Sequence, residues 1–214
     1  MRILASADLH GVAEVYSWLL EVAGAEQPDG LLLAGDLLGV PDGYDRVEEA
    51  QAAEARHVAE RLAAVDCPVF YIMGNDDFVD LKPLSDSIRS VHEARVAFGT
   101  FNVVGYQHTL PFMGGINERP EDQIEEDLRR LEDLVDQGTI LVTHGPAHGV
   151  MDTVTFGGNA GSIALRDLVD RRQPRVHIHG HIHRWFGRDG RHFNVASVPG
   201  TELRSYDSIT TEVR

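Results

Sequence analysis

The sequence predicts an α/β protein in which strands and helices alternate along the chain. Three observations support this prediction: short apolar runs alternate with longer amphipathic segments, several apolar runs stop at polar residues, and 43% of the 214 residues are hydrophobic. Alternation of this kind is typical of layered α/β domains. A chain of this length can bury one sizeable core, so we expect a single domain over residues 1–214.

The predicted strands are short apolar runs bounded by polar or turn-forming residues. They lie at Arg2–Ala7, Gly30–Ala34, Val69–Met73, Phe101–Gly105, Thr139–Thr143 and Arg175–Ile178. The predicted helices have apolar residues every three or four positions on a charged background. They lie at Val12–Ala23, Val47–Val65, Glu121–Val135 and Gly161–Arg171.

The C-terminal part has a different pattern, with shorter apolar runs. Residues Trp185 to Val195 predict a hairpin, because Asp189-Gly190 favours a tight turn between two short runs. The segment Glu202–Val213 is expected to add an edge strand. An exposed edge strand can pair with the same strand of a second copy of the chain, so this strand offers a way to form an oligomer.

Composition excludes several classes of protein. The formal net charge of -15 argues against a protein that grips nucleic acid through a broad basic surface. Cys67 is the only cysteine, which excludes an internal disulfide and a thiolate zinc cluster. No apolar run approaches the ~20 residues that cross a bilayer, and the sequence starts directly with a predicted strand rather than a leader. We therefore expect a cytoplasmic protein with no membrane partner and no bulk nucleic-acid binding.

Five predicted strands stop at side chains that can bind a metal. Their sequences are ILASADLH, LLLAGDLL, VFYIMGNDD, ILVTHG and RVHIHGHIH. In open α/β sheets, ligands bind beyond the carboxyl ends of the strands, so these strand ends should converge on one pocket. The side chains expected there are Asp8, His10, Asp36, Asn75, His144, His181 and His183.

This mixture of carboxylate, amide and imidazole groups indicates the kind of metal. It suits manganese, iron, zinc, cobalt or nickel better than calcium, which prefers oxygen ligands alone. Seven groups exceed the needs of one tetrahedral ion. Two ions roughly 3.5–4 Å apart, with one bridging carboxylate, would use all seven groups and leave positions for water and an oxyanion. We expect two divalent ions, with manganese as the first choice and iron, zinc, nickel or cobalt as alternatives.

Five short blocks occur in a fixed order, namely DLH at Asp8 to His10, GD at Gly35-Asp36, GN at Gly74-Asn75, THG at Thr143 to Gly145 and GHIH at Gly180 to His183. In these blocks the chain resembles the calcineurin-like metallophosphoesterase superfamily. The resemblance implies a four-layer α/β/β/α sandwich with two mixed sheets. It also implies hydrolysis of a phosphomonoester or phosphodiester by a hydroxide that bridges two metals. The implied ligands are Asp8, His10 and His183 for one metal, Asn75, His144 and His181 for the other, and Asp36 for both.

The sequence departs from the family at the third block. The family block is commonly GNH followed by Asp or Glu, whereas this chain has Gly74-Asn75-Asp76-Asp77 and so resembles a subgroup of small phosphoesterases with another residue there. Asp76 occupies the place of the presumed general acid and is the candidate catalytic residue. A carboxylate with an ordinary pKa near ~4 is ionised at neutral pH and donates no proton. Losing general acid help costs roughly 10²–10⁴ in rate, which favours substrates with easier leaving groups.

The resemblance therefore implies a phosphoric ester hydrolase acting on a small phosphoester, with a phosphodiesterase expected first. The alternative is a catalytically weak or inactive binding scaffold of the same fold. A DNA-processing nuclease of the superfamily is disfavoured, because such proteins usually carry extra domains and basic surfaces.

The remaining histidines and one arginine are candidates for substrate contact. His148 and His108 lie in loops after predicted strands, where an exposed loop histidine is the alternative interpretation. Arg184 directly follows His183 and has the guanidinium geometry that pairs with phosphate oxygens. His177 and His179 lie at the end of the predicted strand Arg175–Ile178, and either pack, orient a metal ligand, or contact substrate.

Overall fold

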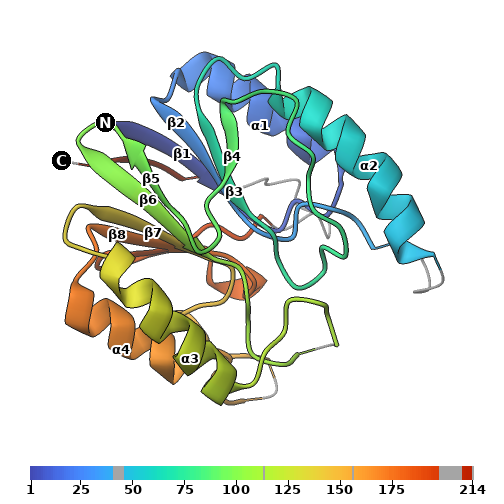
Figure 1. The fold of residues 1–214 in the computed structure, drawn as a ribbon. Coiled ribbons are helices and arrows are strands. Elements are labelled where there is room, and N and C mark those ends of the chain that lie inside the picture. The colour runs from blue at the N-terminus through green and yellow to red at the C-terminus, as the bar shows by residue number, and fades with distance from the viewer. Residues whose placement is uncertain (41–45, 113, 156, 198–208, 214) are drawn as a thin grey trace.

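The computed structural model describes residues 1–40, 46–112, 114–155, 157–197 and 209–213. Two β-sheets lie face to face, and helices cover the outer face of each sheet (Figure 1). The predicted four-layer α/β/β/α sandwich is confirmed. Among the described residues, no helix is both long enough and apolar enough to cross a membrane.

The first sheet has the strand order β11-β1-β2-β3-β4. Its parallel strands are β1 (Arg2–Ser6), β2 (Gly30–Ala34), β3 (Val69–Ile72) and β4 (Ile88–Ser90). Strand β11 (Ile209–Glu212) pairs antiparallel with β1, so the sheet is mixed.

The second sheet has the strand order β5-β6-β7-β8-β10-β9 and is also mixed. Four of its strands run parallel, namely β6 (Phe101–Tyr106), β7 (Thr139–Thr143), β8 (Val176–His179) and β10 (His192–Asn194). The antiparallel edges are β5 (Arg95–Phe98) beside β6 and β9 (Gly187–Asp189) beside β10.

Three apolar clusters hold the layers together. Helices α1 (Ala13–Glu26) and α2 (Val47–Leu62) pack on the first sheet, and α3 (Glu121–Leu131) and α4 (Ile163–Arg172) pack on the second. Successive residues of a strand point to opposite faces, so Leu31 of β2 packs under the helices while Leu32 packs between the sheets. Because both faces are buried, the strands read as unbroken apolar runs.

The six predicted strands, the four predicted helices and the C-terminal hairpin are all present. Gly190 makes the predicted turn between β9 and β10 with a positive φ of 58°. Strands β4 and β5 were not predicted, since they have only three and four residues and are half exposed. The helix predicted to reach Val135 ends at Leu131 and continues as a 3-10 turn over Glu132–Leu134. Of the predicted C-terminal strand, residues 202–208 lie outside the described residues.

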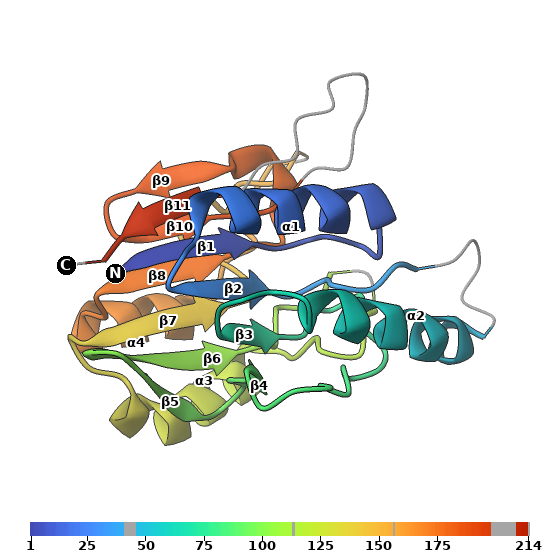
Figure 2. The same cartoon turned by 90° about the horizontal axis from the view of Figure 1, so that it is seen from above.

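The parallel strands of both sheets point the same way, so their carboxyl ends meet at one edge of the sandwich. In Figure 2 this edge is on the right, and the two chain ends lie on the left. The loops that follow β1, β2, β3, β7 and β8 emerge at the right-hand edge. These loops carry the polar residues that the sequence singles out.

Candidate metal centre

The loops at this edge bring the predicted metal ligands together. Asp8 and His10 follow β1, Asp36 follows β2, and Asn75 follows β3 in the first sheet. His144 follows β7, and His181 and His183 follow β8 in the second sheet. The site is therefore built across the interface between the two sheets.

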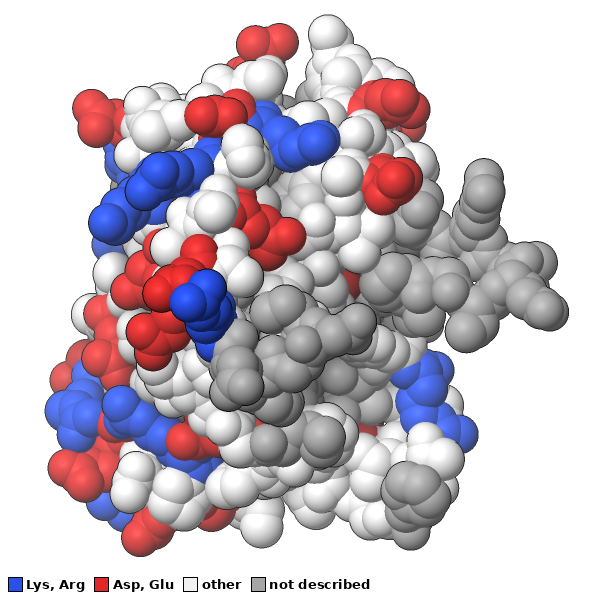
Figure 3. Space-filling view, turned by 90° about the vertical axis from the view of Figure 1, so that its right-hand side faces the viewer, with Lys and Arg blue, Asp and Glu red and all other residues white. Residues whose placement is uncertain are grey.

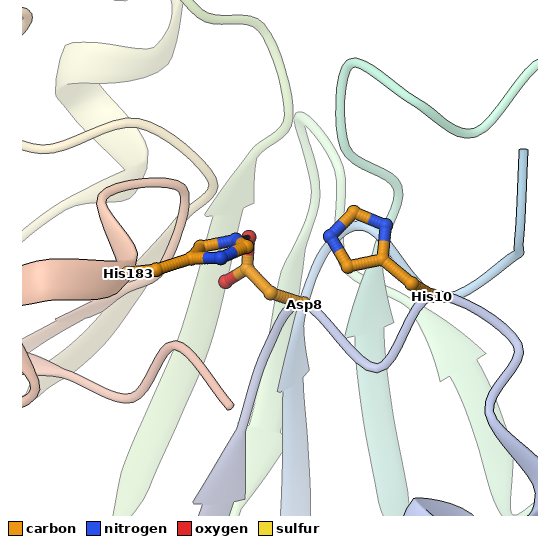
Figure 4. Close-up of side chains that lie close together, drawn as sticks. All are labelled: Asp8, His10 and His183. Carbon is orange, nitrogen blue, oxygen red and sulfur yellow. Dashed lines mark hydrogen bonds and ion pairs between the residues drawn. The ribbon is translucent and has the colours of Figure 1, made fainter. Parts of the chain in front are cut away.

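Asp8, His10 and His183 form one group whose candidate ligand atoms all lie within 4.8 Å of one another. The Nε2 atom of His183 is 3.0 Å from Oδ1 of Asp8. Figure 4 shows the Asp8 carboxylate between the two imidazoles, with His183 on one side and His10 on the other. Asp8 is fully buried, whereas His10 and His183 are partly open to solvent.

Asp36, His144 and His181 form a second group on the same 4.8 Å criterion. His144 Nε2 lies 3.2 Å from Oδ2 of Asp36 and 3.0 Å from Oδ1 of Asn75. The same Asp36 oxygen is 4.0 Å from Nε2 of His10, which belongs to the first group. Asp36 thus faces both groups.

The donor set fits divalent ions. Ligands that each sit about 2.0–2.2 Å from one ion lie about 3 Å apart when they are adjacent in the coordination shell, which agrees with the Asp8–His183 and Asn75–His144 distances of 3.0 Å. His144 Nδ1 donates to the carbonyl of Ala34 at 2.8 Å, which points Nε2 toward Asp36 and Asn75. A metal bound there would displace the proton on Nε2.

Backbone strain is concentrated at this site. Asp8, His10, Asp36 and His181 have positive φ angles of 57°, 44°, 51° and 67°. Side chains other than glycine rarely adopt this region, and such strain is typical of functional sites.

Two glycines allow the loops to approach one another closely. A Cβ atom at Gly74 would overlap Asp36, and a Cβ atom at Gly180 would overlap the carboxylate of Asp8. The close packing lets the backbone N–H of Asp76 donate to Asp36 Oδ1 at 2.9 Å, and that of His181 donate to Asp8 Oδ2 at 3.0 Å. Gly74 and Gly180 therefore occupy positions where a larger side chain would not fit.

Two buried residues that the sequence did not single out hold the loops in place. Asp77 accepts hydrogen bonds from the backbone N–H groups of Leu37, Leu38 and Gly74, and so ties the loop after β2 to the loop after β3. Gln51 of α2 donates to the carbonyls of Gly39 and Asp76. Asp77 stands next to a recognised block, but no local signal marks Gln51.

Asp36 and His144 of the second group shift each other's pKa. Burial alone would lower the pKa of His144, but the carboxylate of Asp36 raises it to about 10. Burial alone would raise the pKa of Asp36, but His144 lowers it below its usual range. Burial and His144 together lower the pKa of His181 to about 4, so this imidazole is neutral and ready to bind a metal at pH 7.

Asp76 lies within the site, where it forms a third group with His10 and Asp36 whose candidate ligand atoms all lie within 4.8 Å of one another. One of its carboxylate oxygens accepts from Asn75 Nδ2 at 2.9 Å, and the other is 4.0 Å from His10 Nδ1. Burial, and then the negative charge of Asp36, raise the pKa of Asp76. Its catalytic role stays a prediction.

The structure does not bring the other substrate candidates into these groups. His148 is half exposed, with Nδ1 3.9 Å from a carboxylate oxygen of Asp152. His108 is buried against the rings of His92 and Tyr106, and burial lowers its pKa to about 4. The exposed Arg184 guanidinium stacks over the Trp185 ring, 5.2 Å from its centroid. Contact of His148, His108 or Arg184 with substrate stays a prediction.

His177 and His179 are fully buried on the second sheet, on the face that points away from the first sheet. His177 Nε2 lies 2.8 Å from the hydroxyl of Thr143, the residue before His144, and His177 Nδ1 lies 2.9 Å from Nδ1 of His192. This arrangement favours the packing and orienting roles over substrate contact.

Comparison with known proteins gives consistent results. A family model for calcineurin-like phosphoesterases matches residues 1–185. The metallophosphoesterase domain-containing proteins 1 of Homo sapiens and Mus musculus are each 44% identical over 57 residues, which is 25% of this chain. The matched segment spans only 18% of the length of either relative.

Solved structures share the fold at low sequence identity. The protein TT1561 of Thermus thermophilus has a TM-score of 0.67 at 19% identity, covering 100% of this chain and 99% of that one. A dimetal phosphatase from Danio rerio has a TM-score of 0.60 at 13% identity, covering 92% and 86%. GAP50, the anchor in the inner membrane complex of Plasmodium, has a TM-score of 0.51 at 13% identity, covering 92% and 71%.

The family model extends over most of the chain, and the five sequence blocks meet at one edge of a four-layer sandwich. The protein therefore belongs to the calcineurin-like phosphoesterase family.

Proposed function

We propose that this protein is a metal-dependent phosphodiesterase that hydrolyses a small phosphoester with the help of two divalent ions. The position of Asp36 is the observation that carries the proposal. One oxygen of this buried carboxylate faces His144 Nε2 at 3.2 Å and His10 Nε2 at 4.0 Å. A carboxylate between two sets of imidazoles is suited to bridge two ions.

Each ion would have its own protein ligands besides Asp36. One set is Asp8, His10 and His183, and the other is Asn75, His144 and His181. The mixed nitrogen and oxygen donors favour manganese, with iron, zinc, nickel or cobalt as alternatives. When bound, the ions supply a water of lowered pKa as nucleophile and positive charge beside the phosphoryl oxygens.

The protein keeps these ligands fixed before substrate arrives. The hydrogen bond from His144 Nδ1 to Ala34 fixes the orientation of the imidazole ring, and the backbone N–H of His181 orients the Asp8 carboxylate. Ligands held in this way need no rearrangement when charge develops on the phosphoryl group. No covalent intermediate with the protein is required.

Asp76 favours a diester over a monoester. Near neutral pH a phosphodiester carries one negative charge, whereas a phosphomonoester carries nearly two because its second pKa is about 6. When ionised, the Asp76 carboxylate beside His10 and Asp36 would repel the monoester more strongly. Replacing Asp76 by asparagine should therefore raise kcat/KM for p-nitrophenyl phosphate about tenfold relative to bis(p-nitrophenyl) phosphate. An unchanged ratio would remove Asp76 as the source of diester preference.

A small substrate fits the charge of the protein better than a nucleic acid does. The formal net charge is -15, and the described residues visible in Figure 3 show basic and acidic side chains mixed, without a broad basic patch. A phosphate backbone gains affinity mainly from basic contacts. We expect the substrate to be a small phosphoester whose one phosphate group is held at the metal centre.

The first test is hydrolysis of bis(p-nitrophenyl) phosphate and p-nitrophenyl phosphate by metal-stripped protein, titrated with manganese, nickel, zinc and magnesium. Asp36→Asn should lose turnover by at least about 100-fold, because the bridge is weakened. Asp86→Asn is the matched control, since Asp86 is exposed and its described hydrogen bond uses only the backbone carbonyl. Hydrolysis retained by the Asp36→Asn protein would refute the proposal.

The second candidate function is a binding scaffold with little or no turnover. It is favoured by the carboxylate of Asp76 at the place where a proton donor is expected, and by the likeness in fold to the anchor GAP50. The presence of all seven predicted ligands argues for the enzyme, because a scaffold has no need of them. Two tightly bound ions without hydrolysis of either ester would support the scaffold.

A further inference from the structure

Phe112 is an exposed aromatic residue beside the metal centre. Its side chain remains 59% exposed although its ring lies 5.3 Å from the ring of His181, centroid to centroid, at an angle of 78°. His181 in turn contacts the ring of His144. An apolar ring is therefore presented to solvent in direct contact with a predicted metal ligand.

The loop that carries Phe112 is held firmly in this position. Both carboxylate oxygens of Glu118 accept hydrogen bonds from the backbone N–H of Gly114, at 3.1 and 3.0 Å, and one of them accepts from the N–H of Phe112 at 2.9 Å. Asn117 donates to the carbonyl of Gly74 at 2.8 Å. These hydrogen bonds fix the backbone at Phe112 and Gly114 relative to Glu118 and tie Asn117 to the loop after β3.

The same loop rests directly on the metal centre. A Cβ atom at Gly115 would overlap the backbone of Asn75, so the loop touches the strand end that supplies a predicted ligand. Ile116, a second exposed apolar residue of this loop, is 56% exposed. Other large apolar side chains are also exposed on the described surface, but Phe112 is the one with a described ring contact to a predicted ligand.

We propose that Phe112 is a stacking platform for a planar aromatic ring of the substrate, so that the substrates are phosphoesters of aryl or nucleoside groups. This inference rests on the proposed function, because it places the phosphate at the metal centre. A ring joined to phosphorus through an ester oxygen or a sugar extends from that centre toward its rim. An exposed aromatic face there offers offset or edge-to-face contact to such a ring, and stacking of this kind accepts any base because every base has a π-face.

The test measures ligand binding and does not depend on turnover. Phenyl phosphate, a nucleoside 5′-monophosphate, methyl phosphate and inorganic phosphate are titrated by calorimetry into the manganese-loaded protein. Phe112→Ala should weaken binding of one or both ring-bearing ligands about fivefold to tenfold, and leave methyl phosphate and inorganic phosphate unchanged. Phe112→Tyr keeps the ring and should restore affinity. Leu84→Ala removes an exposed apolar side chain that lines a separate surface pocket and should change nothing.

The ligands also separate the two sources of an aromatic ring. A selective loss for phenyl phosphate indicates aryl esters, and a selective loss for the nucleotide indicates nucleoside esters. Equal losses for all four ligands, or no loss for either ring-bearing ligand, would overturn the role of Phe112. A failure of the proposed function can be told apart from a failure of the role of Phe112. In the first case the wild-type protein would hydrolyse no phosphoester, regardless of how the Phe112 variants bind the four ligands.

Discussion

Replacing Asp77 by asparagine should loosen the two loops that carry Asp36 and Asn75. Asp77 Oδ2 accepts from the N–H groups of Leu37 and Gly74 at 3.1 and 2.7 Å, and Oδ1 accepts from Leu38 at 2.8 Å. An amide has only one oxygen, so at least one of these buried N–H groups would face an NH₂ group.

The structure sets the size of the expected effect. A hydrogen bond contributes about 0.5–1.5 kcal/mol, and a buried donor left without an acceptor costs about 1–3 kcal/mol. We therefore expect Asp77→Asn to lower the free energy of unfolding by about 2–3 kcal/mol. Since Asp77 positions loops that bear predicted ligands, metal affinity should fall by about 10–100-fold as well.

Urea unfolding of the metal-free protein and calorimetric titration with manganese measure the two effects separately. Asp86→Asn makes the same substitution at an exposed side chain and serves as the control. If the Asp77→Asn protein matched this control in both stability and metal affinity, the role of Asp77 as a tie between the loops would be refuted.

Two further predictions concern close packing and buried histidines. Gly74→Ala would place a Cβ against Asp36 and should reduce manganese affinity at least about tenfold. The control Gly24→Ala lies in open space on α1 and should leave manganese affinity unchanged. Equal manganese affinities for the two variants in a metal titration would contradict the packing argument. Burial lowers the folded-state pKa of His179 to about 3, and it also lowers the pKa of His177. Below about pH 6.5 these two histidines therefore bind protons in the unfolded chain but not in the folded chain. Each of them should lower the free energy of unfolding by about 2 kcal/mol as the pH falls from 7 to 5. In urea unfolding of the metal-free proteins, the free energy of unfolding of His179→Leu should fall less than that of the wild type between pH 7 and pH 5. An equal fall for the two proteins would refute this prediction.

The sequence predicted the layers because most strands are buried on both faces. Runs such as LLLA in β2 and TILVT in β7 are continuous and apolar, which is typical of parallel strands covered on both sides. Strands β4 and β5 have too few residues and too much exposed surface to leave such a pattern. Their pairing depends on the neighbouring strands β3 and β6.

The predicted ligands of the candidate metal centre could be found from the sequence because they directly follow predicted strands. The parallel sheets then bring these ends together, and seven side chains of metal-binding types in five blocks indicate a divalent metal site. The supporting residues were not predictable in this way. Gln51 reaches the carbonyl of Asp76 from a helix 25 residues away, and Phe112 reaches His181 from the loop between β6 and α3, far from His181 in the sequence. Such contacts depend on the tertiary arrangement, which no local pattern records.

The number of ions bound by the protein tests the dinuclear centre most directly. Calorimetric titration of metal-stripped protein with manganese should give two ions per chain for the wild type. Asp36→Asn should bind fewer than two ions, or bind them at least about 100-fold more weakly, because its side chain faces both ligand groups. A single ion in the wild type, or two ions bound with undiminished affinity by Asp36→Asn, would contradict a centre bridged by Asp36.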